Sequence, residues 1–231
     1  MKYSKILIIP DVHGRPFWHY AKDNVDEYDK IIFLGDYLDP YSYEGITEEQ
    51  ALDEFKDIIQ FKKDNIDKVE LLIGNHCEPY IWLTPGYHCR HDYKREGEIH
   101  KLFNDNYKLF KTAHVIDKYL FSHAGIYQEW LDTIHLKLED FLNSDISFWN
   151  GKSQFLDYVS PARGGRDKVS SCVWADISDV YDNTLLKDYY HIFGHTQLED
   201  NPIIWTNFAC LDVRRPFVLD LEINKIEEID D

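Results

Sequence analysis

The stretch KILIIPDVHG, residues 5–14, decides the fold class of this chain. After Lys5 it runs through four consecutive apolar residues without alternation, and it then breaks at Pro10 into Asp11 and His13. A short run that is apolar on both faces is typical of a strand buried inside a layered α/β protein. Carboxylates and imidazoles are also the residue types that bind divalent cations. We therefore expect a buried strand that ends at a polar, metal-binding edge.

The same pattern recurs four more times along the chain. Each further apolar run also stops at a residue able to bind a metal: KIIFLG (30–35) before Asp36, VELLIG (69–74) before Asn75, YLFS (119–122) before His123 and YHIFG (190–194) before His195. Any one of these residues alone is ordinary, because polar residues often terminate strands. Chance rarely places all five in this order, and ligand sites in open α/β sheets form where the carboxyl ends of strands meet. We expect these side chains to converge.

The segment between the second and third runs predicts a helix. In TEEQALDEFKDIIQFKKDN, residues 47–65, Thr47 and Gln50 form a capping-box pattern. One helical stripe collects Leu52, Phe55, Ile58, Ile59 and Lys62. The three segments therefore form a strand–helix–strand unit.

The rest of the chain fits one domain, residues 1–231, with two insertions. The intervals at about 78–112 and 128–188 break the strand pattern, and we expect them to lie over the strand ends, where specificity elements usually sit. Residues 203–221 predict antiparallel strands that close a second sheet, and residues 222–231 predict a charged tail.

Composition narrows the class of partner. The chain carries 25 Lys and Arg against 42 Asp and Glu, a formal net charge of −17 over 231 residues. So acidic a protein is expected to bind long nucleic acid or an anionic membrane poorly. A bound metal cluster would make the local electrostatic field positive and so permit a small phosphate to bind. No apolar stretch approaches the roughly 18 residues of a membrane span. Four scattered cysteines, Cys77, Cys89, Cys172 and Cys210, predict free thiols and a cytoplasmic location.

Taken together, these blocks resemble the calcineurin-like metallophosphoesterases. Five motifs occur in the family's order between about residues 6 and 197: Asp11-Val12-His13-Gly14, Gly35-Asp36-Tyr37-Leu38-Asp39, Gly74-Asn75-His76, Ser122-His123-Ala124-Gly125 and Gly194-His195-Thr196. The segment 172–176 also resembles the Leu-Trp-Ser-Asp stretch of the phosphoprotein-phosphatase branch, which includes small bacterial and phage phosphatases and diadenosine-polyphosphate hydrolases. The resemblance implies a four-layer αββα sandwich of two mixed sheets flanked by helices.

The resemblance also implies a role for each motif residue. Asp11 and His13 would hold a first metal, and Asp36 would bridge two metals. The second metal would take Asn75, His123 and His195. Two divalent ions, Mn²⁺ by preference and Fe or Zn otherwise, would share a hydroxide that attacks phosphorus in line with the leaving oxygen.

His76 and Asp39 are the catalytic pair that the resemblance implies. His76 directly follows the ligand Asn75, and it would protonate the departing alkoxide. A carboxylate at Asp39 would fix the tautomer of that imidazole and favour its protonated form. The alternative is that His76 only packs in its loop.

The sequence departs from the family pattern at the second and fifth blocks. Many relatives carry an Arg after the second Asp to grip phosphate, but Pro40 stands there. The candidate replacements are Arg163, Arg166 and Arg15, of which the first two lie in a glycine-flanked loop. The fifth block continues with Gln197 instead of a second His, so Gln197 is the candidate extra ligand of the first metal.

These features predict a metal-dependent hydrolase of phosphomonoesters acting on a small phosphorylated metabolite or a phosphoprotein. A phosphodiesterase or dinucleoside-polyphosphate hydrolase on the same site is the first alternative. The insertion aromatics Tyr80, Trp82, Tyr87 and Tyr93 would stack on a base in that case. An inactive scaffold that keeps the fold as a binding module is the second alternative. The sequence does not fix the oligomeric state.

Overall fold

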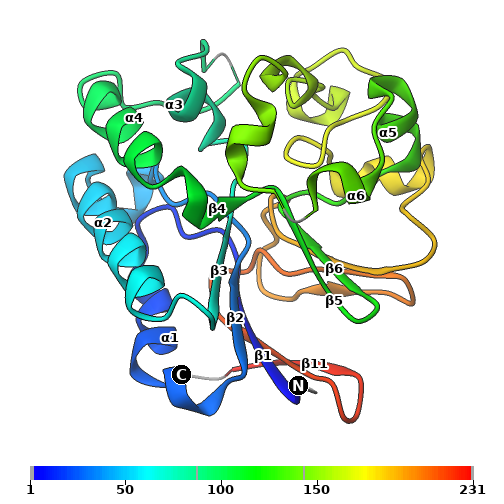
Figure 1. Cartoon of the computed structure of the whole chain (residues 1–231), viewed down its shortest axis with the longest axis horizontal. Helices are drawn as coiled ribbons and strands as arrows, with labels where there is room; N and C mark the ends of the chain where they lie inside the picture. The colour runs from blue at the N-terminus through cyan, green and yellow to red at the C-terminus, as the bar shows by residue number, and fades with distance from the viewer. Residues whose placement is uncertain (1–2, 87, 143, 230–231) are drawn as a thin grey trace.

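Two β-sheets packed face to face form the centre of the molecule (Figure 1). The computed structural model describes residues 3–86, 88–142 and 144–229. The first sheet has the strand order β11-β10-β1-β2-β3-β4, and the second has the order β5-β6-β7-β9-β8. Both are mixed sheets, as expected.

The first sheet contains β1 (Lys5–Ile9), β2 (Lys30–Phe33), β3 (Val69–Leu72), β4 (Phe110–Lys111), β10 (Phe217–Asp220) and β11 (Lys225–Glu228). Its strands β1 to β4 run parallel, while β10 pairs antiparallel with β1 and β11 pairs antiparallel with β10. The second sheet contains β5 (Ala113–Ile116), β6 (Tyr119–Ser122), β7 (Tyr190–Phe193), β8 (Ile203–Ile204) and β9 (Phe208–Cys210). Here β6, β7 and β9 are parallel, with β5 and β8 antiparallel at the edges.

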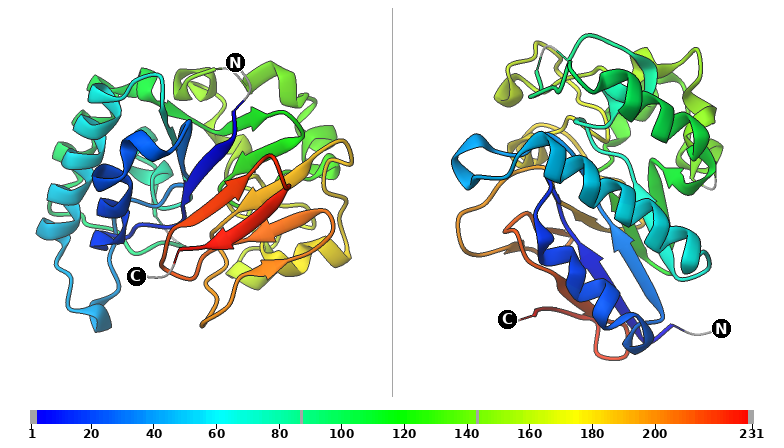
Figure 2. Two further views of the ribbon diagram at one scale, coloured as in Figure 1. Left: turned by 90° about the horizontal axis from the view of Figure 1, so that it is seen from below. Right: turned by 90° about the vertical axis from the view of Figure 1, so that its left-hand side faces the viewer.

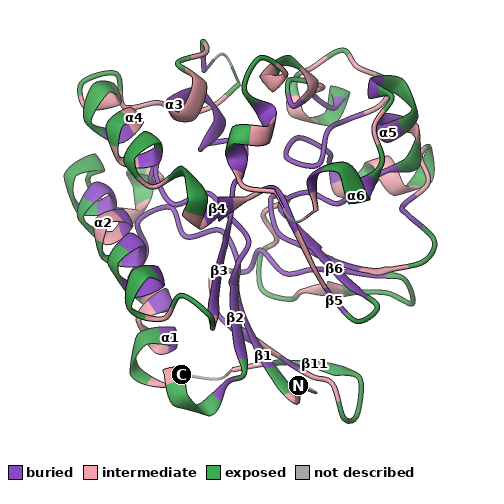
Figure 3. Cartoon of the chain, in the orientation of Figure 1, coloured by how far each residue is buried: buried purple, intermediate pink, exposed green. Residues whose placement is uncertain are grey.

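Alternate residues of β1 divide between two cores, which accounts for the absence of alternation in its sequence. Ile6 and Ile8 pack between the sheets against Phe121 and Ile192 of the second sheet. Leu7 and Ile9 face the opposite side, where the helices cover the first sheet. Figure 3 shows the central strands largely buried, whereas the edge strand β11 is exposed or half-buried, like the outer faces of the helices and the loops.

The predicted helix is confirmed as α2 (Glu48–Asp64). Its capping box is formed: the Gln50 amide donates to the Thr47 hydroxyl oxygen, and the Gln50 side chain accepts from the Thr47 amide. All five predicted stripe residues are buried. Together with the short α1 (His19–Asp23), α2 covers one face of the first sheet (Figure 2).

The C-terminal prediction is wrong in part. Strands β8 and β9 do join the second sheet, but β10 returns to the first sheet beside β1. Residues 225–228 are not a tail, because they form the edge strand β11. Apolar alternation shows that a strand has a buried face, but it does not show which sheet supplies the hydrogen bonds.

The two insertions lie at the end of the molecule where the parallel strands finish (Figure 1). The first contains α3 (Glu78–Trp82) and α4 (Glu96–Asp105), and its last residues enter the sheet as β4. The second contains α5 (Gln128–Ile134), α6 (Leu138–Phe141) and several 3₁₀ turns. Ala175 and Leu185 of this insertion, with Ala124 and Tyr127 just before it, contribute to a core on the outer face of the second sheet.

All four cysteines are free thiols, as predicted. Within the described ranges, we find no helix with the length and apolarity needed to cross a bilayer.

Candidate functional site

The five strand-end blocks converge on one edge of the sheets. Asp11 follows β1, Asp36 follows β2 and Asn75 follows β3, while His123 and His195 follow β6 and β7 of the other sheet. A cavity of about 310 Å³ opens there. Its walls are His13, Asp36, Tyr41, Asn75, His76, His88, Arg90, Ala162, Arg163, Trp174 and His195.

Four nitrogen and oxygen atoms of the types that bind metals meet around the Nε2 of His123. Its Nε2 lies 2.9 Å from the Asn75 Oδ1, 3.1 Å from the His195 Nδ1 and 3.4 Å from the Asp36 Oδ2. Nitrogen and oxygen acceptors packed this closely need a shared positive charge, and a divalent metal accepts from all of them at once.

Backbone carbonyls orient two of the imidazoles toward the site. The Nδ1 of His123 donates to the Leu34 carbonyl at 2.8 Å, and the Nδ1 of His13 donates to the Leu38 carbonyl at 2.7 Å. Each Nε2 therefore faces inward, and that of His13 lies 3.7 Å from the Asp36 carboxylate. Metal-ligating histidines typically show this outer hydrogen bond.

Burial and neighbouring charges set the pKa values of these imidazoles. Burial lowers the pKa of His13 and of His195 well below the usual value, so both are neutral, as ligation requires. Burial would also lower the pKa of His123, but the carboxylates of Asp36 and Asp11 raise it to about 9. A dication at this position would replace the proton on His123.

Two clusters of side chains that could bind a metal share the carboxylate of Asp36, and we call them the two acceptor groups. His13, Asp36 and His76 place ligand atoms within 4.8 Å of one another, and so do Asp36, His123 and His195. The Nε2 of His195 is buried and has no partner among the described residues. A side chain common to two such groups suits a bridging ligand, so the residues present fit a pair of divalent ions.

The backbone is tightly constrained around these carboxylates. A Cβ on Gly74 would collide with the Asp36 carboxylate, and one on Gly194 would collide with that of Asp11. His13, Asp36 and His195 all adopt left-handed backbone conformations, with φ of 46°, 48° and 61°. Such conformations are costly for residues other than glycine and cluster at functional sites.

His76 and Asp39 form the predicted pair. The His76 Nδ1 lies 2.7 Å from the Asp39 Oδ2, and the Tyr80 hydroxyl donates to the other carboxylate oxygen at 2.5 Å. Asp39 is itself left-handed, with φ of 59°. Asp39 occupies the Nδ1 of His76, and the His76 side chain lines the cavity.

Of the three predicted phosphate-binding arginines, the structure brings only Arg163 to the cavity. Its Nε lies 2.9 Å from the Asp176 carboxylate, and its Nη2 donates to the Thr196 hydroxyl at 2.7 Å. Arg15 is buried and forms a bidentate ion pair with Glu44 at 2.8 and 3.0 Å, so the Glu44 carboxylate neutralises its charge. Arg166 is exposed and lines a neighbouring cavity instead.

Sequence reasoning missed Arg90, which lies in the first insertion. Its Nε donates to the Asp39 carbonyl at 3.0 Å, and its guanidinium lies 3.6 Å from the centre of the Tyr41 ring. Among the described residues it has no carboxylate partner, so its charge faces the cavity unpaired. The loop around Arg90 has no periodic pattern that would single it out in the sequence.

Asp212 was also missed, although it directly follows an apolar strand as the other site residues do. Its carboxylate is buried, and its Oδ1 has no hydrogen-bond donor in the described structure. Burial and the nearby Asp11 raise the pKa of Asp212 well above its usual range. Gln197, by contrast, is not brought to the cluster, because its side-chain amide lies 3.3 Å from the Tyr43 hydroxyl.

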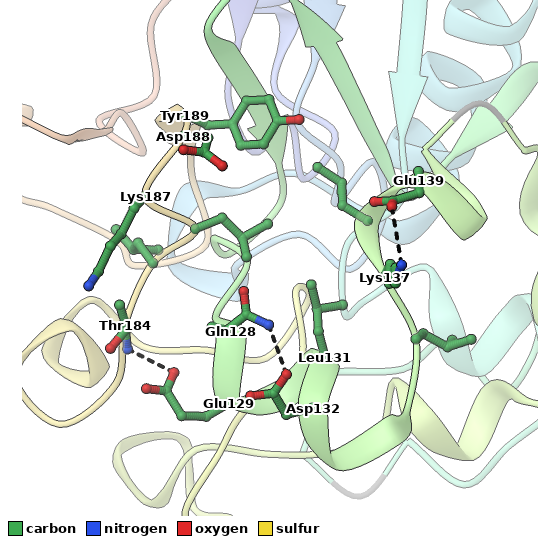
Figure 4. Close-up of a pocket in the computed structure, with 14 residues that line it drawn as sticks. Gln128, Glu129, Leu131, Asp132, Lys137, Glu139, Thr184, Lys187, Asp188 and Tyr189 are labelled. Atoms are coloured by element: carbon green, nitrogen blue, oxygen red, sulfur yellow. Dashed lines mark hydrogen bonds and ion pairs between the residues drawn. The ribbon is translucent and has the colours of Figure 1, made fainter.

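A larger cavity, of about 690 Å³, lies elsewhere, between α5, α6 and residues 184–189 (Figure 4). Its polar groups pair with one another: Gln128 with Asp132 at 2.8 Å and the Thr184 amide with Glu129 at 2.8 Å. It contains none of the strand-end residues, so the smaller cavity is the candidate active site.

Comparison with protein families agrees with this placement. Residues 4–199 match the family model of the calcineurin-like phosphoesterases. No curated protein sequence matched the chain.

Solved structures share the fold at low sequence identity. A cold-active protein-tyrosine phosphatase from the psychrophile Shewanella sp. aligns with a TM-score of 0.60 and 15% identity, over 99% of this chain and 81% of that one. A protein serine/threonine phosphatase from Saccharomyces cerevisiae, described as similar to human phosphatase PP5, aligns with a TM-score of 0.53 and 14% identity, over 99% and 80%. These matches support the two-sheet αββα architecture predicted from the sequence.

Proposed function

This chain belongs to the calcineurin-like phosphoesterase family, and from that membership we propose that it hydrolyses phosphomonoesters at a dinuclear metal centre. The family makes it a metal-dependent phosphoesterase. The monoester specificity is supported by one observation above all: two arginines reach the cavity in which two acceptor groups share Asp36. The substrate is a small phosphorylated metabolite or a phosphoprotein, and the whole chain acts as one domain.

The family pattern gives ligands to each ion: Asp11, His13 and Asp36 would hold the first, and Asp36, Asn75, His123 and His195 the second. The closeness of His13 to Asp36, of His123 and His195 to Asp36, and of Asn75 to His123 supports this division. Mn²⁺ suits this mixture of carboxylate, amide and imidazole donors, with Fe and Zn as alternatives. Bound there, the two ions supply the positive charge that activates a water nucleophile and neutralises the phosphoryl oxygens.

His76 is the general acid of the proposed reaction. Its Nε2 would donate a proton to the departing oxygen, because Asp39 holds the Nδ1 at 2.7 Å and thereby fixes the tautomer. Tyr80 fixes Asp39 in turn, by donating a hydrogen bond to its second oxygen. This chain orients the imidazole before the substrate arrives.

Arg90 and Arg163 are proposed to grip the phosphate. A monoester dianion presents one more charged oxygen than a diester, and a guanidinium recognises such an oxygen by charge-assisted hydrogen bonds. Arg90 would replace the family's missing Arg at position 40, since it packs against the Asp39 carbonyl from a different loop.

The substrate preference is tested with a panel of phenyl phosphate, a phosphopeptide, bis-nitrophenyl phosphate and diadenosine tetraphosphate in the presence of Mn²⁺. We expect kcat/KM for the monoesters to exceed that for the diester by at least about tenfold, the value of one charge-assisted hydrogen bond. Preferential turnover of the diester or of the dinucleotide would replace the monoester proposal with the first alternative. Absence of turnover with every metal would favour the scaffold.

The insertion aromatics give little support to a nucleotide substrate. Tyr80 is fully buried and stacks on His91, with ring centroids 4.2 Å apart, so neither of its faces is open to a base. Trp82 donates to Asn150 and lines neither the active-site cavity nor its neighbour. Tyr93 is exposed, and Tyr87 lies outside the described residues.

Replacing Arg90 by Ala should lower kcat/KM for phenyl phosphate by about 10- to 100-fold, because one charged hydrogen-bond donor to the dianion is lost. Inhibition by inorganic phosphate should weaken to a similar extent. The matched control is Lys94→Ala, which removes an exposed cation from the same loop and should change both quantities less than about twofold. An Arg90→Ala enzyme with unchanged phosphate inhibition would remove Arg90 from the phosphate site.

A further inference from the structure

A second cavity, of about 610 Å³, adjoins the proposed active site. The two cavities share the wall residues His88 and Trp174, and both are lined by residues of the ranges 84–86, 88–90 and 157–167. Gly164 approaches His88 here, since an added Cβ would lie 3.6 Å from the His88 Nδ1, and we call this place the neck. We treat the two adjoining cavities as compartments of one groove.

A buried carboxyl group lines the second compartment. Glu78, in the first turn of α3, is only 2% exposed. Its Oε2 accepts a hydrogen bond from the Trp174 Nε1 at 3.3 Å, but its Oε1 has no donor among the described residues. A buried carboxyl oxygen without a donor is costly, so its presence in a cavity wall calls for a ligand that donates.

Asp157 is an acidic neighbour of Glu78. Asp157 lines the same compartment from the solvent side. Burial first, and Asp157 second, raise the pKa of Glu78 well above its usual range. Two neighbouring carboxyl groups of this kind share a proton, and a cation can take the place of that proton.

The two compartments differ in their charged side chains. Around the strand ends the lining contains Arg90 and Arg163 together with Asp36. Beyond the neck, the charged side chains are Glu78, Asp157, Asp167 and a single Arg166, which is exposed. Asp167 is already engaged by the Val159 amide at 2.9 Å, so Glu78 and Asp157 are the carboxyl groups left for a ligand.

We propose that this second compartment is the leaving-group subsite of the enzyme, and that it selects phosphomonoesters whose alcohol portion carries a primary ammonium group. The subsite rests on the proposed monoesterase function and narrows its substrate class. An ammonium has three donors and no acceptor, so once the proton of Glu78 has passed to solvent it would donate to the Glu78 Oε1 and to Asp157 together. The phosphate then lies among the arginines while the ammonium lies beyond the neck.

The test compares ω-aminoalkyl phosphates of increasing chain length with alkyl phosphates of the same length. At one length the wild-type enzyme should prefer the amine by at least about tenfold in kcat/KM, as expected for a hydrogen bond between charged groups. Glu78→Gln keeps an acceptor for Trp174 but can never become a carboxylate, and it should abolish the preference without slowing the alkyl phosphates. Asp157→Asn changes an exposed position and should weaken the preference for the amine. This variant provides the test if Glu78→Gln does not fold.

The matched control is Glu199→Gln, which removes an exposed carboxylate that lines neither compartment. It should leave the preference unchanged. Equal rates for amine and alkane at every length, or a preference that survives both substitutions in the compartment, would overturn the subsite.

A binding measurement separates this inference from the proposed function. If no alkyl phosphate is hydrolysed, the monoesterase proposal fails by itself. Calorimetry with the corresponding amino alcohols then tests the subsite alone: binding to the wild-type protein that is lost in Glu78→Gln supports it, and absence of binding to the wild-type protein refutes it.

Discussion

Replacing Asp36 by Asn is expected to abolish phosphoester hydrolysis, with a fall in kcat of at least about 10³-fold. Asp36 is the residue common to both acceptor groups, and its Oδ2 lies 3.7 Å from the His13 Nε2 and 3.4 Å from that of His123. In the wild-type protein the Asp36 Oδ1 accepts a hydrogen bond from the His76 amide at 2.9 Å, and an Asn side chain of the same size keeps an oxygen for this bond. The substitution removes the negative charge that would hold two cations together.

Thermal unfolding gives a readout of this variant that does not depend on activity. Mn²⁺ at about 100 times its dissociation constant should stabilise the wild-type protein by about 2.7 kcal/mol, because it binds the folded state alone. The Asp36→Asn protein should show little of this stabilisation, whereas Asp53→Asn, an exposed change on α2, should show all of it. Retention of both turnover and manganese stabilisation in Asp36→Asn would remove Asp36 from the bridging position.

The second large effect is expected for His76→Ala, and it should depend on the leaving group. An alkyl phosphate expels a strongly basic alkoxide, so loss of the general acid should lower kcat by about 10²- to 10⁴-fold. Nitrophenyl phosphate expels a stable phenolate that needs no proton, so its rate should fall far less. Steady-state rates of the two substrates with the same enzyme preparation measure the difference.

Two further variants check the His76 assignment. Asp39→Asn should produce a smaller loss with the same leaving-group dependence, because it disturbs the 2.7 Å contact that orients the imidazole. Tyr80→Phe removes only the hydroxyl that donates to Asp39 and should be milder still. Equal losses for both substrates in His76→Ala would assign this residue to positioning or folding instead of proton transfer.

The sequence predicted the strand ends of the site well because local pattern determines them. Each parallel strand is short, apolar and followed within a few residues by its polar side chain, and parallel strands align their carboxyl ends. The capping box of α2 is equally local, since its two partners are three residues apart. Asp212 carries the same signal after β9 and could have been identified from it.

Contacts between segments that are distant in the sequence could not be predicted from local sequence patterns. Arg15 was expected to bind phosphate, but Glu44, 29 positions away, neutralises it. Arg90 reaches the site because its loop folds back onto Asp39, 51 positions earlier, and no periodicity marks that contact. For the same reason β10 was assigned to the wrong sheet: its apolar residues would have served either sheet, and the chain path decided between them.

Crystals grown with Mn²⁺ and soaked with vanadate test the dinuclear phosphomonoesterase most directly. Anomalous scattering should place two manganese ions on either side of Asp36, one against Asp11 and His13 and the other against Asn75, His123 and His195, with vanadate held by Arg90 and Arg163. A single ion, two ions that do not share Asp36, or vanadate bound away from both arginines would contradict the account.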